Sequence, residues 1–264
     1  MFVIGTIWLY KVIVEPIYVL IYKKPLIVHL YFFSQKLSEN YQTFLGNHFT
    51  FYKRLSPEYQ KYFDHRILTF IKKTEFNSRE NVNITFEMKL LLVAPSIILT
   101  FGMPKYGYTV VKNIIVYPTS FFSVTNTNYH IGEFNPKLKT LVFSWQDFFE
   151  GIKIDNDNLN LGIHEFSHAL LFESLQKTKY SSNNTSIFAD YYNEIIADLK
   201  KPELLKTIID TRYFRNYAFT NSVEFIAVIL EHFFETPQEF KLLLPELYLK
   251  VKKMINYNEN IFIS

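Results

Sequence analysis

The chain has 264 residues, a formal net charge of +3 and no cysteine. The lack of cysteine excludes disulfides and cysteine-ligated zinc sites, and the small charge without a basic stripe argues against a nucleic-acid partner. The length suits one domain with an appendage, and we expect an apolar segment at 1–33 followed by a domain at 34–264.

The first 33 residues are rich in aliphatic and aromatic side chains and carry few charges. One interpretation is a transmembrane helix over residues 2–22, since roughly 20 apolar residues span a bilayer. Lys23 and Lys24 would then mark the cytoplasmic side, where the domain would also lie. Lys11 and Glu15 fall in the middle of this span, where charged side chains are costly. The two residues are four apart, so on a helix their opposite charges can neutralise each other.

The alternative for this segment is an apolar arm that packs on the domain or lies at the membrane interface. A secretory signal peptide is disfavoured because the segment has no basic n-region and no small-x-small cleavage site. We therefore expect a membrane-associated protein with its domain on the cytoplasmic side, and the alternative localisation is cytoplasmic.

Two helices and two strands are predicted next along the chain. One helix covers 55–76, and a second covers 86–102 with a break or kink at Pro95. Residues 110–117 and 139–144 are short and rich in β-branched residues, as strands are. These strands predict a small sheet, and we expect its edge strand to offer backbone groups to an extended peptide.

Residues 164–168 read HEFSH and match the pattern H-E-x-x-H. Apolar residues at helical spacing surround the pattern, which predicts a buried helix. His164 and His168 then lie one turn apart on one face and can bind one metal ion, for which zinc is best suited. Glu165 can take a proton from a water molecule at that metal. The competing interpretation is two surface histidines on an amphipathic helix.

A catalytic zinc site usually has a third protein ligand. The extended pattern H-E-x-x-H-x-x-G-x-x-H is absent, because Leu171 and Ser174 stand where it needs glycine and histidine. The third ligand should therefore come from the apolar helix predicted within residues 216–240. Glu224 and Glu231 lie about two turns apart on one face of that helix, and a buried carboxylate needs a metal or a partner. Both are candidates, and a capping or salt-bridge role is the alternative for Glu224.

Four blocks of this sequence resemble one known family, the zinc metallopeptidases related to Mlc titration factor A. The resemblance covers roughly residues 55–250, and the blocks occur in the family's order and spacing. The blocks are NIIVYPTSFF (113–122), LVFSWQDFFEG (141–151), HEFSHALLFE (164–173) and NYAFTNSVEFIAVILEHFFETP (216–237). The resemblance implies an α+β, zincin-type fold that is mostly helical, with a small sheet preceding the H-E-x-x-H helix.

The resemblance also implies roles for individual residues. His164, His168 and Glu224 are implied as the ligands of one zinc ion, and Glu165 as the general base. Tyr217 is implied as the residue that stabilises the oxyanion. The competing interpretation of Tyr217 is a packed aromatic residue with a satisfied hydroxyl.

Position 171 departs from the family pattern, and the role of Glu231 and the structure of residues 177–194 are not implied by the resemblance. Family members often carry an acidic residue where this chain has Leu171, which puts any polar contact of that acid in doubt. Glu231 is expected either to hold a ligand imidazole by its distal N–H or to be structural. Residues 177–194 are polar and unmatched, and we expect a loop near the cleft.

The function implied is a zinc-dependent peptidase that acts on peptide or protein substrates. The resemblance suggests aminopeptidase-type activity on short substrates, and an endopeptidase is the alternative. The alternative is a regulatory binding protein that sequesters a transcription regulator or another partner, because the namesake of the family is known for such a role. The segment 1–33 would add a membrane as a further partner.

Overall fold

The computed structural model describes residues 10–123, 127–154, 156–176 and 183–263. Its main sheet has the strand order β1-β2-β6-β5, in which β5 is antiparallel to β6 and the other pairs are parallel. A short antiparallel hairpin pairs two further strands. The strands are β1 (Glu75–Ser78), β2 (Asn113–Tyr117), β3 (Phe121–Ser123), β4 (Asn128–His130), β5 (Gly132–Asn135) and β6 (Thr140–Ser144).

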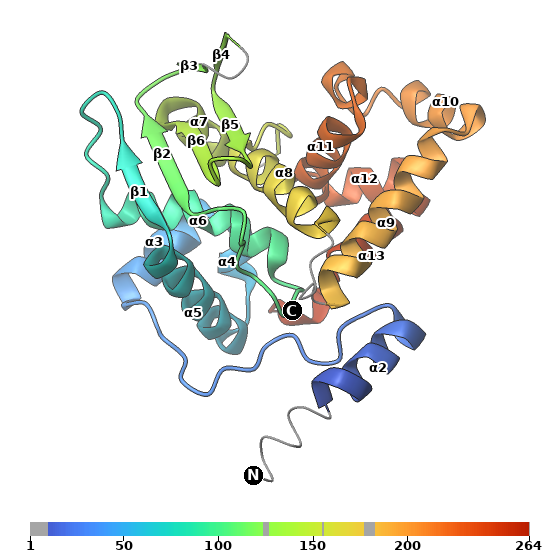
Figure 1. The fold of residues 1–264 in the computed structure, drawn as a ribbon, viewed down its shortest axis with the longest axis horizontal. Coiled ribbons are helices and arrows are strands. Elements are labelled where there is room, and N and C mark those ends of the chain that lie inside the picture. The colour runs from blue at the N-terminus through green and yellow to red at the C-terminus, as the bar shows by residue number, and fades with distance from the viewer. Residues whose placement is uncertain (1–9, 124–126, 155, 177–182, 264) are drawn as a thin grey trace.

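Helices make up most of the remaining structure, and in the view of Figure 1 most of them lie below the sheet and to its right. The helices before the motif are α2 (Glu15–Tyr22), α3 (Glu39–His48), α4 (Thr50–Arg54), α5 (Pro57–Lys73), α6 (Phe86–Thr100) and α7 (Trp145–Lys153). From the motif onward they are α8 (Leu161–Leu175), α9 (Asn183–Leu199), α10 (Pro202–Asp210), α11 (Ser222–Glu235), α12 (Pro237–Leu243) and α13 (Pro245–Met254). Three short helices of other types are the π-helix η1 (Tyr10–Val14) and the 3₁₀ helices η2 (Asn216–Phe219) and η3 (Glu259–Ile261). The predicted α+β class, mostly helical with a small sheet before the motif helix, is confirmed.

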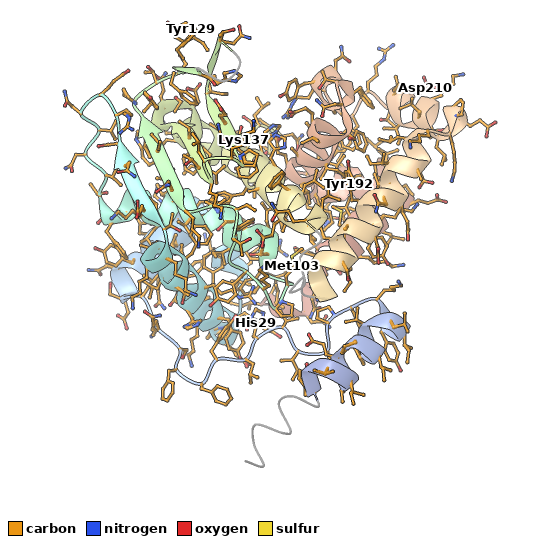
Figure 2. All side chains as sticks on the ribbon, in the orientation of Figure 1. His29, Met103, Tyr129, Lys137, Tyr192 and Asp210 are labelled. Atoms are coloured by element: carbon orange, nitrogen blue, oxygen red, sulfur yellow. The ribbon has the colours of Figure 1, made fainter. Side chains whose placement is uncertain are left out.

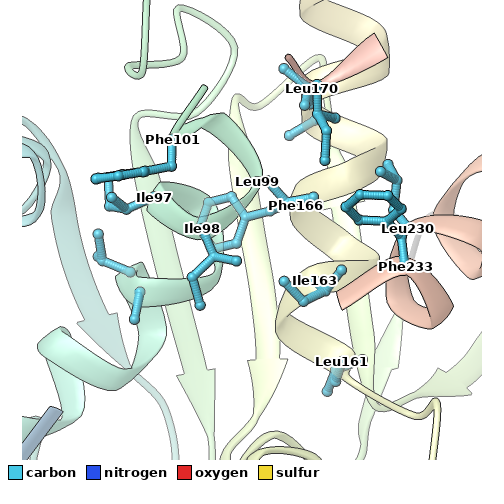
Figure 3. Close-up of a cluster of buried hydrophobic side chains, with 14 of the residues drawn as sticks. Ile97, Ile98, Leu99, Phe101, Leu161, Ile163, Phe166, Leu170, Leu230 and Phe233 are labelled. Atoms are coloured by element: carbon cyan, nitrogen blue, oxygen red, sulfur yellow. The ribbon is translucent and has the colours of Figure 1, made fainter. Parts of the chain in front are cut away.

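Helix α8 is the centre of the hydrophobic core. It packs against α6 on one side and α11 on the other, and both neighbours are themselves strongly apolar (Figure 3). Phe166 of α8 is fully buried and reaches toward Leu99 of α6, while Leu230 of α11 is fully buried on the other side. Burying a side chain of this kind contributes about 1.5–3 kcal/mol, so the motif helix is fixed from both sides.

The two predicted helices and two predicted strands are present. Helix α5 begins at Pro57 as expected, and strands β2 and β6 lie within the predicted ranges. Of the break or kink expected at Pro95, the break is absent, because α6 continues through this residue to Thr100. Pro95 is buried, and its ring lies against α8, so packing compensates for the lost backbone hydrogen bond.

The loop expected at 177–194 is wrong for the part that the structure describes. Residues 183–194 form the first turns of α9, and 177–182 lie outside the described residues. Ile187, Phe188 and Ile195 are buried at helical spacing and hold α9 against α8 and α13. The run of asparagine and serine before Ile187 concealed this apolar stripe.

The edge strand beside the motif helix is β5, which the sequence did not predict. Both predicted strands, β2 and β6, are interior to the sheet. Strand β5 has the sequence GEFN, which is short and lacks β-branched residues, so neither propensity nor alternation identified it. If an extended peptide binds the edge of this sheet beside the motif helix, β5 is therefore the strand that it would pair with.

The N-terminal arm, which we define as residues 10–38, runs along the side of the molecule opposite the β3–β4 hairpin (Figure 1). It consists of η1, α2 and an extended stretch that leads into α3. In the described part of the chain, no helix combines the length and the apolar character that a bilayer crossing requires. The span predicted at 2–22 begins outside that part, at residues 2–9.

Candidate metal centre

Helix α8 carries both histidines of the motif on the face that looks toward α11. The Nε2 atoms of His164 and His168 are 3.1 Å apart. Asn160 caps the helix by accepting a hydrogen bond from the backbone N–H of Ile163, which fixes its first turn. Gly162 allows this close packing, because a Cβ there would lie 2.6 Å from Pro95 Cγ.

Helix α11 brings a carboxylate to the same point. Asn221 caps this helix and accepts hydrogen bonds from the backbone N–H groups of Val223 and Glu224. Glu224 Oε2 then lies 3.0 Å from His164 Nε2 and 3.5 Å from His168 Nε2. The three donor atoms all lie within 4.8 Å of one another. The structure therefore brings together the three residues that the resemblance implied as ligands.

The donor set fits a zinc ion. Two imidazole nitrogens and one carboxylate oxygen are the ligands of many catalytic zinc sites. Glu224 Oε2 is buried and lies within 3.5 Å of both imidazole Nε2 atoms, an arrangement that a cation shared by the three atoms would stabilise. Burial lowers the pKa of His164, but hydrogen bonds to Glu224 and Glu231 outweigh burial and raise the pKa to about 10. The pocket thus favours positive charge.

Glu165 lies beside the two histidines and faces the edge strand. Its side chain is buried, and burial raises the pKa of its carboxyl group, while His168 and His164 lower it. A Cβ on Gly132 of β5 would lie 2.6 Å from Glu165 Oε1, so only glycine leaves room for this carboxylate. The carboxylate is thus enclosed between α8 and β5.

Tyr217 stands at the rim of the site in η2. Its ring centroid lies 6.0 Å from that of His164, and 47% of the residue is exposed. Burial of part of the ring and the neighbouring Glu224 carboxylate both raise the pKa of its hydroxyl group. Tyr217 is therefore a neutral phenol at neutral pH and can donate a hydrogen bond into the site.

Glu231 contacts the other side of the His164 ring. His164 Nδ1 and Glu231 Oε1 are 2.5 Å apart, and Glu231 is 1% exposed. Arg215 donates hydrogen bonds to both oxygens of Glu231, at 2.8 and 3.0 Å. Glu231 thus accepts a hydrogen bond from Nδ1–H, and a metal ion that displaces the proton on Nε2 can bind there.

Arg215 is the site residue that sequence reasoning missed. It also donates a hydrogen bond to the carbonyl of Asn158, in the loop before α8. The buried acid Glu231 required a cation or a metal, and an arginine two residues before Tyr217 was an available partner. The need of a buried glutamate for a positively charged partner was the one feature of the sequence that could have identified Arg215.

His168 lacks an equivalent contact in the described part of the chain. Its Nδ1 atom is buried without a hydrogen-bond partner. Leu171, which replaces the acid of the family pattern, is buried in the core. The two imidazoles are thus held differently, His164 by a carboxylate and His168 by packing.

Glu235 anchors the loop that precedes α8, and we expect it to make stability depend on pH. Its carboxylate accepts a hydrogen bond from the backbone N–H of Asn158, and burial raises its pKa to about 8. The carboxyl group of Glu235 holds its proton more tightly in the folded than in the unfolded protein. The free energy of unfolding therefore decreases as the pH rises from about 4.5 to about 8. Glu235→Gln should remove this loss and be about 1–3 kcal/mol more stable than the wild type at pH 8.

This expectation is checked by urea unfolding of both proteins at pH 5 and pH 8. The stability difference between variant and wild type should grow with pH. The exposed Glu239→Gln in α12 is the control and should show no such growth. A difference that stays constant for Glu235→Gln would refute the expectation.

A cleft of about 550 Å³ opens in front of the site. His164, Glu165, Arg215 and Tyr217 line its floor. Its walls come from β4, the start of β5, helix α7 and the loop that precedes α8. The cleft gives an extended ligand access to the carboxylate of Glu165 and to the phenol of Tyr217.

Comparison with known proteins agrees with this geometry. The chain is similar to the uncharacterized protein slr2042 of Synechocystis sp., with 26% identity over 240 residues that cover 84% of this chain and 85% of that protein. Residues 31–255 match the family described as Glucose-regulated metallo-peptidase M90, which confirms the resemblance inferred from the four sequence blocks. Because this match extends over the sheet, the cleft and both helices that carry the candidate ligands, the chain belongs to the M90 family of glucose-regulated metallo-peptidases.

Proposed function

We propose that this protein is a zinc-dependent peptidase that hydrolyses peptide bonds in the cleft between α8, α11 and β5. The observation that carries the proposal is the convergence of the His164, His168 and Glu224 donor atoms beside the buried carboxylate of Glu165. A zinc ion held by these three residues supplies a Lewis acid that polarises a carbonyl group and lowers the pKa of water.

The side chains of the cleft carry the proton transfers and the charge stabilisation. Glu165 accepts a proton from the attacking water molecule, since burial raises the pKa of its carboxyl group. It then gives this proton to the amine nitrogen that leaves as the C–N bond breaks. The neutral phenol of Tyr217 donates a hydrogen bond to the developing oxyanion. Glu231 and Arg215 hold the His164 ring in its metal-binding orientation.

The edge strand β5 binds the substrate backbone in this proposal. Among the described strands, β5 is the outermost of the sheet, and Gly132 at its start lines the cleft. An extended peptide can pair with an edge strand. The peptide bond to be cleaved then lies over the His164 side of the cleft.

We further propose cleavage at the N-terminal end of short peptides. The cleft wall carries the carboxylates of Asp147 and Asp157, which favour a positively charged group such as an α-ammonium group, while Glu150 already pairs with Lys153. Hydrolysis of matched peptides with free and acetylated N-termini tests this assignment. Faster turnover of the free peptides is expected, and equal turnover would show an endopeptidase.

The test of the proposed function is hydrolysis of a peptide library by the full chain. Hydrolysis should stop on treatment with a chelator and return when zinc is added. Hydrolysis that persists after complete removal of metal would refute the proposal.

Arg215→Met should weaken zinc binding about 10- to 100-fold, as loss of an outer partner of a metal-binding histidine does. The variant leaves Glu231 without its cation, so the His164 ring is held less firmly. Competition with a chelator measures the affinity, and thermal unfolding of the metal-free protein reports any change in folding. Arg212→Met, an exposed arginine three residues earlier, is the matched control. Equal zinc affinity of Arg215→Met and wild type would show that Arg215 has no part in positioning.

A further inference from the structure

The inner side of the N-terminal arm holds it to the domain through both apolar packing and hydrogen bonds. Leu37 is buried in the core, and several hydrogen bonds centre on the fully buried Arg66 of α5. Arg66 donates hydrogen bonds to the carbonyl of Val28 and to the hydroxyl of Tyr31. The backbone N–H of Leu37 donates to Asp64. The arm is therefore fastened to the domain, and its outward position is fixed.

The outward side of this arm is apolar. Twelve of the 28 exposed large hydrophobic side chains in the described part of the chain lie between Val12 and Phe33, a far higher density than elsewhere. Leu26 lines the cavity between the arm and the domain. We call the other eleven the outer apolar surface: Val12, Ile13, Val14, Ile17, Leu20, Ile21, Tyr22, Ile27, Leu30, Phe32 and Phe33. Exposed apolar side chains at this density mark a binding surface.

The helical part of the arm has the pattern of a helix that lies flat on a bilayer. Ile13, Ile17, Leu20 and Ile21 recur at helical spacing and are all exposed, so they form one outward stripe. Val19, on the opposite face of α2, is buried against the domain. In the extended stretch, Phe32 and Phe33 are 82% and 91% exposed, the fractions expected of side chains that insert into an apolar phase.

The charges of the arm favour anionic lipid as the bound partner. The arm contains four lysines, Lys11, Lys23, Lys24 and Lys36, and one acidic residue, Glu15. The last three lysines are exposed, and Lys23 approaches Asp190 of α9 at 3.8 Å. Lysines beside an inserted apolar surface add attraction to anionic headgroups. Pairing of two copies through this surface would bring the lysines of both copies together, which is unfavourable.

We propose that the outer apolar surface binds the interface of a lipid bilayer that contains anionic lipid. The arm and the β3–β4 hairpin lie at opposite sides of the molecule, where Figure 2 labels His29 and Tyr129. Tyr129 lines the cleft, so the bound protein keeps its cleft open to the aqueous phase. This inference does not depend on the proposed peptidase function.

The test is flotation of the full chain with vesicles of phosphatidylcholine, with and without phosphatidylglycerol. The wild type should float with the anionic vesicles, and added salt should weaken the binding. The double substitution Phe32→Ser with Phe33→Ser should lower the bound fraction at least tenfold. The matched control is Leu242→Ser with Leu138→Ser, two leucines that are 81% and 69% exposed outside the arm.

Several outcomes would overturn the proposal. One is a wild type that does not float, and another is equal loss of flotation in both double variants. A third is a dimer, measured by light scattering, that Phe32→Ser with Phe33→Ser dissociates while vesicle binding stays absent; the surface would then bind a second copy. Peptide hydrolysis should be unchanged in both double variants, which separates this test from that of the proposed function.

Discussion

Glu165→Gln should lower kcat for peptide hydrolysis by about 10²- to 10⁴-fold, the usual contribution of a general base. Glutamine keeps the size of the side chain and fits the same space beside Gly132, so the protein should fold normally. It cannot accept the proton of the attacking water molecule. Zinc content should stay at the wild-type level, because Glu165 is not one of the three converging donors.

The control for this variant is Glu150→Gln, which removes an exposed carboxylate that lines the same cleft. It should change kcat far less than Glu165→Gln does. The assay is the initial rate at saturating peptide, measured beside the metal content of each preparation. Turnover of Glu165→Gln near the wild-type rate would remove Glu165 from the mechanism.

Tyr217→Phe should lower kcat by about 10²-fold or more, as the loss of one oxyanion donor does in other hydrolases. The change deletes only the hydroxyl group, which burial and Glu224 keep neutral and therefore able to donate. KM should change little, because the hydrogen bond strengthens as charge develops in the transition state. Zinc content should be unchanged.

Tyr129→Phe provides the matched control, since Tyr129 also lines the cleft and is even more exposed. Its kcat should stay within a few-fold of the wild type. Steady-state kinetics on one peptide substrate compares the two variants. A KM effect with unchanged kcat in Tyr217→Phe would assign the tyrosine to substrate binding alone, against our proposal.

The shared face of His164 and His168 was predictable, because it follows from a spacing of four residues on one helix. The choice between Glu224 and Glu231 was left open by the residues, and the family resemblance implied Glu224. The asparagine cap places Glu224 in the first turn of α11. Both helices are largely apolar, but each carries polar residues other than the candidate ligands, such as Glu173 in α8 and His232 in α11, so polarity alone does not identify a ligand.

The parts that escaped prediction depend on contacts between distant segments. Arg215 acquires its role only because folding brings it to Glu231 and to the loop at Asn158. Strand β5 is defined by its pairing with β6, since its own four residues carry no strand signal. Helix α9 was concealed by polar residues at its start, although its later apolar positions follow helical spacing.

The central claim is that His164, His168 and Glu224 hold one zinc ion, and the most direct measurement is metal content. Zinc is measured in the full chain and in the variants His164→Ala and Glu224→Ala, after purification under metal-replete conditions. We predict about one zinc ion per wild-type chain, lost from both variants. A wild type without zinc, or a Glu224→Ala variant that retains it, would contradict the assignment.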